Sequence, residues 1–407
     1  MSALLPLAAM VLLCAIAWSA SLERRAVHWR SVAAALALQV AIGALVLYVP
    51  EGRAALERLS VAVTGVLAYA RAGIDFVFGA VAGEGLGFVF AFEVLPVIIF
   101  FSALVSALYH LGIMGWVIRI IGGALQRLLG TGRAESLAAA SNIFVSQTEA
   151  PLVVRPYLAR MTRSELFAVM VGGMATVAGS VLAGYVALGV EMRYLLAASF
   201  MAAPGGLLMA KLLVPETERA RAVAEHHAQP QREPHVNVID AAAAGAASGL
   251  ALAVNIGATL LAFVGLIALL NGLLGWCGQW LGLDGLTLQG LLGALFRPLA
   301  FVLGVPWPEA ATAGSLIGQK LVLNEFVAYA SYYEVRGQLG AHSQAVVSFA
   351  LCGFANFSSI AVLLGGLGTL VPARRGEVAA LGMRAVAGGF LANLMSAAIA
   401  SLFLALR

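Results

Sequence analysis

This sequence predicts an all-α protein with several membrane-spanning helices, and three observations support that fold class. Of its 407 residues, 61% are hydrophobic and only 11% are charged, and the mean hydropathy is +0.95. Apolar runs of about 20 residues, long enough to cross a bilayer as a helix, recur along the chain. Two polar segments that contain proline interrupt this pattern, and each is followed by two further spans. An ordinary soluble domain is excluded, because about a quarter of its residues would be charged.

The basic residues predict the orientation of the chain. The net charge is +4 and the isoelectric point is about 9.1. In membrane proteins lysine and arginine gather in cytoplasmic loops, so this charge gives no reason to expect a nucleic-acid partner. The run from Leu4 to Ala20 imitates a signal peptide, but Arg24 and Arg25 follow the apolar run instead of preceding it. We therefore expect an uncleaved first span, with the N-terminus outside a bacterial-type inner membrane.

Residues 1–133 are expected to form mostly a scaffold. Within it, residues 55–83 carry charges at intervals, such as Glu57 and Asp75, which suits a helix that lies in the membrane interface. The apolar runs predict spans at 3–21, 31–49 and 87–109.

Residues 134–213 are expected to form a first transport repeat. Its opening segment, 134–158, is too polar for a plain span and has basic residues near both ends. A segment that enters and leaves on one side of the membrane would show this pattern, so a re-entrant hairpin is expected. The remaining spans of this repeat are predicted at 166–190 and 194–213.

The second half of the chain repeats this organisation. Residues 214–240 are hydrophilic and predict a cytoplasmic loop, in which the pair His226 and His227 lacks further metal ligands. Residues 241–305 are expected to form a long scaffold span, over 243–272, and an interfacial helix. Residues 306–407 are expected to form a second transport repeat, with a broken segment at 306–337 and spans at 343–370 and 378–405.

One odd span between the two repeats would place the second copy upside down relative to the first. Inverted repeats with discontinuous helices that meet near the middle of the membrane are typical of secondary transporters. The sequence therefore favours a carrier built from two inverted repeats.

Three polar motifs stand out, two in the predicted broken segments and one within the predicted span at 343–370. The first is Ser141-Asn142-Ile143-Phe144-Val145-Ser146-Gln147-Thr148-Glu149-Ala150-Pro151, the second is Leu323-Asn324-Glu325-Phe326, and the third runs from Gly353 to Ser359. An unsatisfied polar group costs several kcal/mol in hydrocarbon, so these groups need partners. No lysine or arginine lies inside the motifs, so a phosphate or carboxylate would find no countercharge there. The predicted ligand is neutral and rich in hydrogen-bond donors, as a nucleoside is.

The side chains suggest a role for each part of such a site. The Glu325 carboxylate can accept hydrogen bonds from two ribose hydroxyls, and Asn356 and Ser359 can complete that set. Gln147 can pair with the edge of a base. Phe354 and Val181 would supply apolar walls. Polar residues also join helices in membranes, but two intramembrane glutamates favour a functional site.

A site for a coupling cation is predicted beside the first motif. Its ligands would be the side chains of Asn142 and Thr176 and the backbone carbonyls of Val145 and Val177. Carbonyls at a helix break are where transporters hold sodium, and the alternative is that these residues only cap helix ends.

At these motifs the sequence resembles the concentrative nucleoside transporter family. The run Val177-Ala178-Gly179-Ser180-Val181-Leu182-Ala183-Gly184-Tyr185 also looks like a broken helix of that family. The resemblance implies a homotrimer of about eight spans plus two hairpins per subunit, and symport of nucleosides with sodium. It further implies that Gln147, Thr148 and Glu149 read the base, that Glu325, Asn356 and Ser359 bind the ribose, and that Asn142, Val145, Thr176 and Val177 bind sodium. Many members have glycine at the position of Ser146, and the serine implies a preference for pyrimidine nucleosides.

We therefore expect a sodium-driven nucleoside importer that works by alternating access and uses no cofactor. A proton-coupled carrier, with Glu149 or Glu325 as the titrating group, is the alternative. A membrane enzyme is not expected, because the spans contain no paired-aspartate or zinc motif and no nucleophile beside a base. A passive channel is the remaining alternative.

Overall fold

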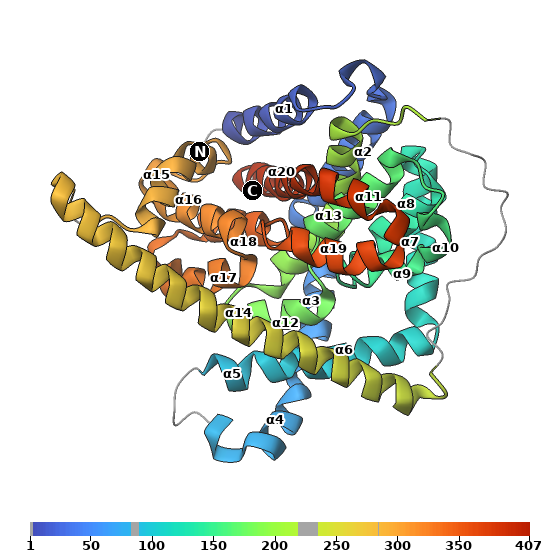
Figure 1. Cartoon of the computed structure of the whole chain (residues 1–407), viewed down its shortest axis with the longest axis horizontal. Coiled ribbons are helices and arrows are strands. Elements are labelled where there is room, and N and C mark those ends of the chain that lie inside the picture. Colours follow the sequence, from blue (N-terminus) through green and yellow to red (C-terminus); the bar gives the residue numbers. More distant parts are fainter. Residues whose placement is uncertain (1–2, 83–88, 219–234, 284) are drawn as a thin grey trace.

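The described residues form helices joined by turns and short loops, with no β-strand among them, so the all-α prediction is confirmed (Figure 1). The computed structural model describes residues 3–82, 89–218, 235–283 and 285–407. The histidine pair at 226 and 227 lies outside the described residues. The helices before the first broken segment are α1 (Leu4–Ser19), α2 (Trp29–Leu47), α3 (Pro50–Ala68), α4 (Ala70–Phe78), α5 (Phe90–Glu93), α6 (Leu95–His110) and α7 (Ile113–Leu129).

Each of the two broken segments and the span that follows it is divided by non-helical residues. Between the two sets lie the long helix α14 (Val238–Leu281) and α15 (Leu288–Val302). The first set consists of α8 (Arg133–Ser141), α9 (Ala150–Val153), α10 (Arg155–Leu158), α11 (Arg163–Ala175), α12 (Gly179–Ala187) and α13 (Met192–Leu213). The second set consists of α16 (Trp307–Val322), α17 (Glu325–Val335), α18 (Ala341–Leu351), α19 (Ser359–Leu370) and α20 (Arg375–Ala405).

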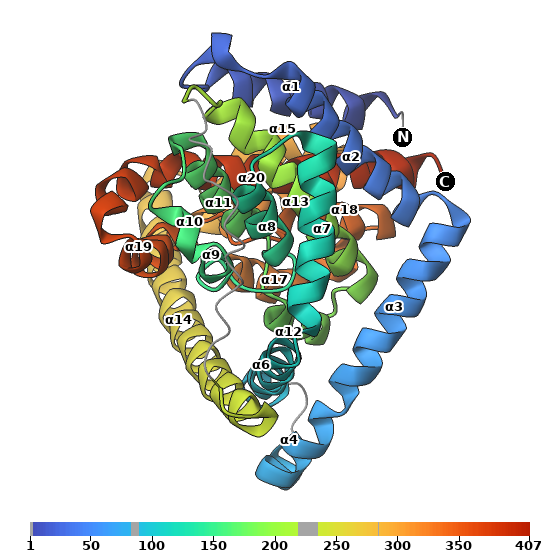
Figure 2. The same ribbon diagram turned by 90° about the vertical axis from the view of Figure 1, so that its right-hand side faces the viewer.

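Burial divides the helices into an inner and an outer group. In the apolar windows of α13 and α20, 83% and 89% of the residues are buried, whereas only 22% are buried in α14 and 11% in the run Phe90–His110 that α5 and α6 form. A helix that is apolar on all sides and also buried belongs to the interior of a bundle. Figure 2 shows α14 and α3 along opposite sides of the molecule, with the inner helices between them. The outer helices therefore leave more of their apolar surface uncovered than the inner helices do.

Small residues allow α6 and α14 to pack closely. A side chain at Gly245 would collide with Ser106, because an added Cβ would lie 2.5 Å from the serine Cβ. Ser106 Oγ also donates a hydrogen bond to the Ala241 carbonyl at 2.7 Å. Close contact through glycine and serine is typical of helices that associate in membranes.

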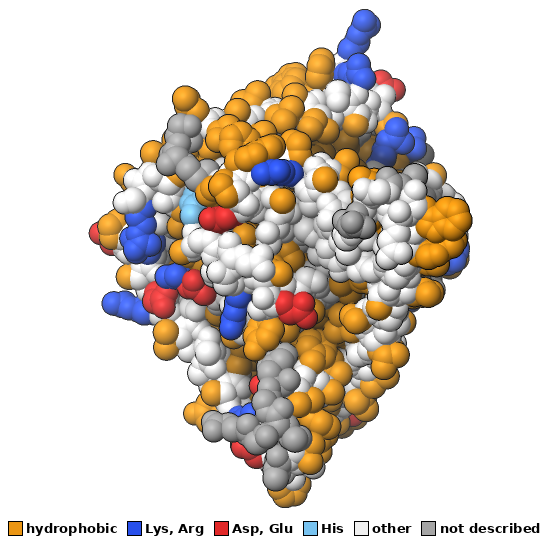
Figure 3. Space-filling model, turned by 90° about the vertical axis from the view of Figure 1, so that its left-hand side faces the viewer, with side chains coloured by type: hydrophobic (Ala, Val, Ile, Leu, Met, Phe, Trp, Pro, Cys, Tyr) orange, Lys and Arg blue, Asp and Glu red, His pale blue; other side chains and the backbone are white. Residues whose placement is uncertain are grey.

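Apolar side chains cover much of the surface. They spread over large parts of the face in Figure 3, where charged side chains occur in limited groups. Phe76, Leu261 and Trp280 are among the large apolar residues that are exposed. A soluble monomer rarely exposes contiguous apolar areas of this kind, so the surface fits a protein embedded in a bilayer.

The number of long apolar helices agrees broadly with the predicted spans, with three differences. The predicted span at 343–370 is divided into α18 and α19, neither of which is long enough to cross. Among the described residues, seven helices are long and apolar enough to cross a membrane, or eight if the bent pair α15 and α16 forms one span. The predicted span at 3–21 becomes α1, which has only 16 residues. The segment predicted to be interfacial, 55–83, overlaps a 29-residue helical run, Pro50–Phe78, that is long enough to cross. The pairing of Arg71 with Asp75 at 2.8 Å lowers the cost of charges in that run.

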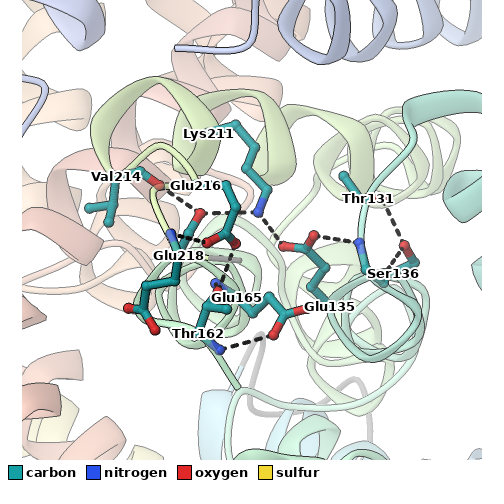
Figure 4. Close-up of polar contacts among 11 residues, drawn as sticks. Thr131, Glu135, Ser136, Thr162, Glu165, Lys211, Val214, Glu216 and Glu218 are labelled. Carbon is teal, nitrogen blue, oxygen red and sulfur yellow. Dashed lines mark hydrogen bonds and ion pairs between the residues drawn. The ribbon is translucent and has the colours of Figure 1, made fainter. Parts of the chain in front are cut away.

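A group of polar residues fastens the ends of three inner helices (Figure 4). Lys211 of α13 forms a 2.7 Å ion pair with Glu135 of α8 and donates to Ser164 Oγ of α11 at 3.1 Å. Thr162, at the start of α11, donates to Glu216 at 2.7 Å. The start of the first broken segment, in α8, is therefore linked to α11 and α13.

Candidate functional site

The first motif forms the break between α8 and α9. After Ser141 the chain leaves the helix, and it resumes helical geometry at Ala150, next to Pro151, whose missing N–H suits the first turn of a helix. Ser146 and Thr148 contact each other through their hydroxyls at 3.0 Å, and the Glu149 carboxylate accepts from the Ser146 N–H at 3.1 Å. The predicted base-reading residues thus lie on one short non-helical turn.

Each broken segment is joined to the broken helix that follows it by a backbone hydrogen bond. The Phe144 carbonyl accepts from the Gly179 N–H at 3.0 Å, and the Leu321 carbonyl accepts from the Phe357 N–H at 3.3 Å. No larger residue fits at Gly179, because an added Cβ would lie 2.9 Å from the Phe144 oxygen. In both halves of the chain, a backbone hydrogen bond therefore links the broken segment to the break in the following helix.

The breaks in the two helices also meet each other. The Phe354 N–H, in the break between α18 and α19, donates to the Thr176 carbonyl, in the break between α11 and α12, at 3.1 Å. Tyr185 of α12 also packs against two rings of α17, with ring centroids 4.3 Å from Tyr329 and 5.0 Å from Phe326. The break after α11 is therefore in direct contact with the third motif, and α12 is in contact with the helix that follows the second motif.

The three residues predicted to bind ribose form one hydrogen-bonded group. The Asn356 amide donates to the Glu325 carboxylate at 2.9 Å, and its oxygen accepts from the Ser359 N–H at 2.9 Å and from the Ser359 hydroxyl at 3.1 Å. Ser358 also donates to this oxygen, at 2.7 Å. Asn356 therefore holds the start of α19 and the Glu325 carboxylate in one arrangement.

The two predicted glutamates have different surroundings. Glu325 is 4% exposed, whereas Glu149 is exposed. They share no hydrogen-bond partner among the described residues. Of the predicted apolar walls, Val181 is fully buried at the start of α12 and Phe354 is half-buried.

The four residues predicted to bind a cation include a buried amide without a partner. Asn142 is 1% exposed, and neither its oxygen nor its nitrogen has a hydrogen-bond partner among the described residues. Its side chain lies against the last turn of α11, because a Cβ added at Gly172 would be 2.9 Å from its Nδ2. The Thr176 hydroxyl donates to the Gly172 carbonyl at 2.9 Å and keeps its lone pairs as acceptors.

The backbone completes this set of oxygens. Among the described residues, no turn or side-chain hydrogen bond uses the carbonyl of Val145 or of Val177, and both residues are buried. Buried polar groups are nearly always paired, so these oxygens beside one helix end form a candidate ligand site. Neutral oxygen ligands suit a small hard cation.

Comparisons with known proteins identify the family. The family models described as Na+ dependent nucleoside transporter N-terminus, Nucleoside recognition and Na+ dependent nucleoside transporter C-terminus match residues 8–81, 91–192 and 194–401. The chain belongs to the sodium-dependent nucleoside transporter family. Members of this family are transporters, so this chain is an integral membrane transporter and not an enzyme, as the sequence predicted.

Relatives of this nucleoside transporter extend over its full length. The nucleoside permease NupC of Helicobacter pylori is 51% identical, with 100% of this chain and 99% of the relative covered. Human sodium/nucleoside cotransporter 1 is 41% identical over 95% of this chain and 62% of its own length. The solved structure of CNTnw in an inward-facing substrate-bound state is 56% identical, covers 100% of this chain and 99% of its own, and has a TM-score of 0.96.

Two buried residues of this nucleoside transporter were missed by the sequence reasoning. Lys320 lies five positions before Glu325 in α16 and is 0% exposed, so a basic group does stand close to the second motif. Asn393 of α20 donates to the carbonyls of Ala175 at 2.6 Å and Cys352 at 2.8 Å. Lys320 could have been found as a charge within an apolar run, since such charges are costly and usually functional. Asn393 carried no local signal.

Proposed function

We propose that this transporter imports nucleosides together with sodium, in a bacterial inner membrane and with its N-terminus outside. The sodium assignment is supported mainly by Asn142, a buried amide whose two polar atoms have no partner among the described residues. Sodium bound by Asn142, Thr176 and the carbonyls of Val145 and Val177 would satisfy these groups. Because the site adjoins the break between α11 and α12, ion binding would order the same backbone that Phe354 contacts.

The substrate lies between the two halves of the chain. Glu325, Asn356 and Ser359 accept and donate hydrogen bonds to the ribose, whose adjacent hydroxyls would replace part of the present contacts of Asn356. Gln147, Thr148 and Glu149 read the base, with Phe354 and Val181 as apolar neighbours. Val181 is fully buried in this structure, so its contact with a base needs a small movement of α12.

Ser146 selects pyrimidines. Its hydroxyl is held by Thr148, so it occupies space and presents a fixed polar atom beside the base-reading residues. A larger purine ring would displace this pair, whereas uracil or cytosine would not.

The transport cycle is alternating access by two inverted repeats, residues 134–213 and 306–407, each with a re-entrant hairpin. The repeated order of broken segment, broken helix and long helix supports this assignment. Residues 1–133 and 241–305 form the scaffold, which contacts lipid and, in a homotrimer, the other subunits. The apolar surface of α14 is largely exposed and that of α6 is half-buried, which fits that role.

Uptake of radiolabelled uridine into proteoliposomes tests this function. With sodium outside, uridine should accumulate above its external concentration, and replacement of sodium by choline should abolish accumulation. Uptake that persists in choline and follows a pH gradient would establish the proton-coupled alternative. Uptake that only equilibrates uridine would establish a passive channel.

A further inference from the structure

Lys320 is a buried ammonium group that the proposed site does not use. Its nitrogen donates to the Ala350 carbonyl at 3.1 Å and to the Asn393 side-chain oxygen at 2.5 Å, and it lies 5.4 Å from the centre of the Phe390 ring. Removal of an ammonium from water costs several kcal/mol, which only well-placed oxygens and a favourable field offset. The surroundings of Lys320 are built to hold a cation.

The favourable electric field at Lys320 comes from the C-terminal end of α18, which is the first half of a broken helix. α18 ends at Leu351, and the break that follows leaves carbonyls of its last turn without their usual helical partners. The C-terminal end of a helix carries a partial negative charge, so a cation beside Ala350 is stabilised. Lys320 thus caps the first half of the broken helix in the second repeat.

The first repeat has the corresponding helix end but no such ammonium. The separation in sequence from Glu149 to Glu325 equals that from Thr176 to Cys352, so the motifs of the two repeats can be aligned. In this alignment the residue that corresponds to Lys320 is Phe144. At the end of α11 the neighbouring group from the broken segment is Asn142, the neutral amide of the proposed sodium site.

One side chain connects the two helix ends. Asn393 donates to Ala175, the last residue of α11, and to Cys352, just after α18, while its oxygen accepts from Lys320. An added Cβ at Gly353 would lie only 2.2 Å from the Asn393 oxygen, so no larger residue fits there. The amide of Asn393 therefore links the end of α11, beside the proposed sodium site, to Lys320.

We propose that the Lys320 ammonium takes the place in the second repeat that the sodium ion has in the first. It is a cation permanently attached to the chain, and it lies at the end of α18 as the sodium ion would lie at the end of α11. The ammonium holds the end of α18 and thereby positions Asn356 in the break that follows, and through Asn356 the Glu325 carboxylate at the start of α17. Only the first repeat then binds a sodium ion, so that repeat alone couples sodium entry to nucleoside transport. This inference rests on the proposed sodium site for its comparison with the first repeat, but the role of the ammonium is tested independently of sodium.

Chemical rescue tests the proposal. Lys320→Ala removes the atoms of n-propylammonium and leaves the space and oxygen ligands that held them. Uridine uptake should fall by at least about tenfold, the effect of one lost charge-assisted hydrogen bond, and n-propylammonium should restore part of it. Lys320→Met is the matched control, because it fills the space with an apolar chain and should respond to no amine. Rescue by n-propanol as well as by n-propylammonium would show that volume and not charge matters, and would overturn the proposal.

Two further measurements keep the outcome decisive. Thermal unfolding of Lys320→Ala in detergent should shift upward with n-propylammonium in the absence of sodium and nucleoside, and an unchanged unfolding temperature would overturn the proposal. In the unmodified protein, the flux ratio of labelled sodium to uridine should be one, and a ratio of two would also overturn it. Sodium-independent uptake by the unmodified protein would instead refute the proposed sodium coupling, while the amine rescue would still report on Lys320.

Discussion

Asn356 and Glu325 are joined by a 2.9 Å hydrogen bond across the centre of the molecule, from the break in one helix to the first residue of another. Both side chains are almost fully buried. The amide therefore fixes the direction of the carboxylate before any substrate arrives, and preorganisation of this kind reduces the cost of binding.

Glu325→Gln should leave the protein folded and reduce uridine uptake by more than about a hundredfold, because two charge-assisted hydrogen bonds to hydroxyls are lost. Glutamine has nearly the same shape, and its oxygen can still accept from Asn356. Uptake into proteoliposomes and thermal unfolding should be measured together.

The same substitution at Glu309 serves as the control for Glu325→Gln. The Glu309 carboxylate accepts from the Gly340 N–H at 3.0 Å, far from the breaks in sequence and outside the proposed substrate contacts. Glu309→Gln should transport normally. Near-normal transport by Glu325→Gln would contradict the ribose assignment.

Ser146→Gly should increase the ability of inosine and adenosine to compete with uridine by at least about tenfold, since one small group in a pocket can change discrimination by that amount. The change removes the hydroxyl that pairs with Thr148. Competition curves for purine and pyrimidine nucleosides give the measurement. Ser358→Ala, which removes a hydroxyl at the ribose end, should leave the ratio unchanged, and no gain in purine competition by Ser146→Gly would count against the assignment.

Asn142→Leu should abolish sodium-driven uptake without loss of stability in sodium-free buffer, because the replaced polar atoms have no protein partner among the described residues. The unmodified protein should gain about 1.4 kcal/mol of stability at a sodium concentration ten times its dissociation constant, and the variant should gain none. Unfolding curves with and without sodium measure both quantities.

A helix-capping asparagine gives the contrasting control. Asn237 accepts from the N–H groups of Ile239 and Asp240 at the start of α14, so Asn237→Ala should cost about 1 kcal/mol with or without sodium. The same behaviour in Asn142→Leu would mean that Asn142 is only a cap.

Lys211→Met should destabilise the protein by about 3–5 kcal/mol, since it leaves the Glu135 carboxylate buried without its cation. The side chains of Glu135 and Lys211 are 2% and 11% exposed. The double variant with Glu135→Gln should recover most of the loss, as a double-mutant cycle in detergent would show. Asp75→Asn, which breaks the exposed pair with Arg71, should cost less than about 1 kcal/mol, and an equal loss in both cases would contradict the burial argument.

Features that depend on neighbouring residues could be read from the sequence. Apolar runs predicted most of the helices, because the length and composition of a segment decide whether it can cross a bilayer. The first and second polar motifs correctly marked the breaks after Ser141 and at Asn324, since proline and competing side-chain hydrogen bonds act within a few residues. The breaks within 166–190 and 343–370 lay inside apolar stretches that otherwise predicted continuous spans.

Contacts between distant segments were decided only by the tertiary structure. Lys320 and Asn393 are 73 residues apart, and Asn393 and Ala175 are 218 apart, so no local pattern links them. The burial of Glu325 and the exposure of Glu149 likewise depend on which helices pack over each motif. The sequence by itself determined an all-helical membrane protein with polar breaks and the residues they offer, because propensity and hydrophobicity are local. Packing alone decided which helix end meets which charge, because a cation is stable in the interior only where several segments bring their oxygens to one point.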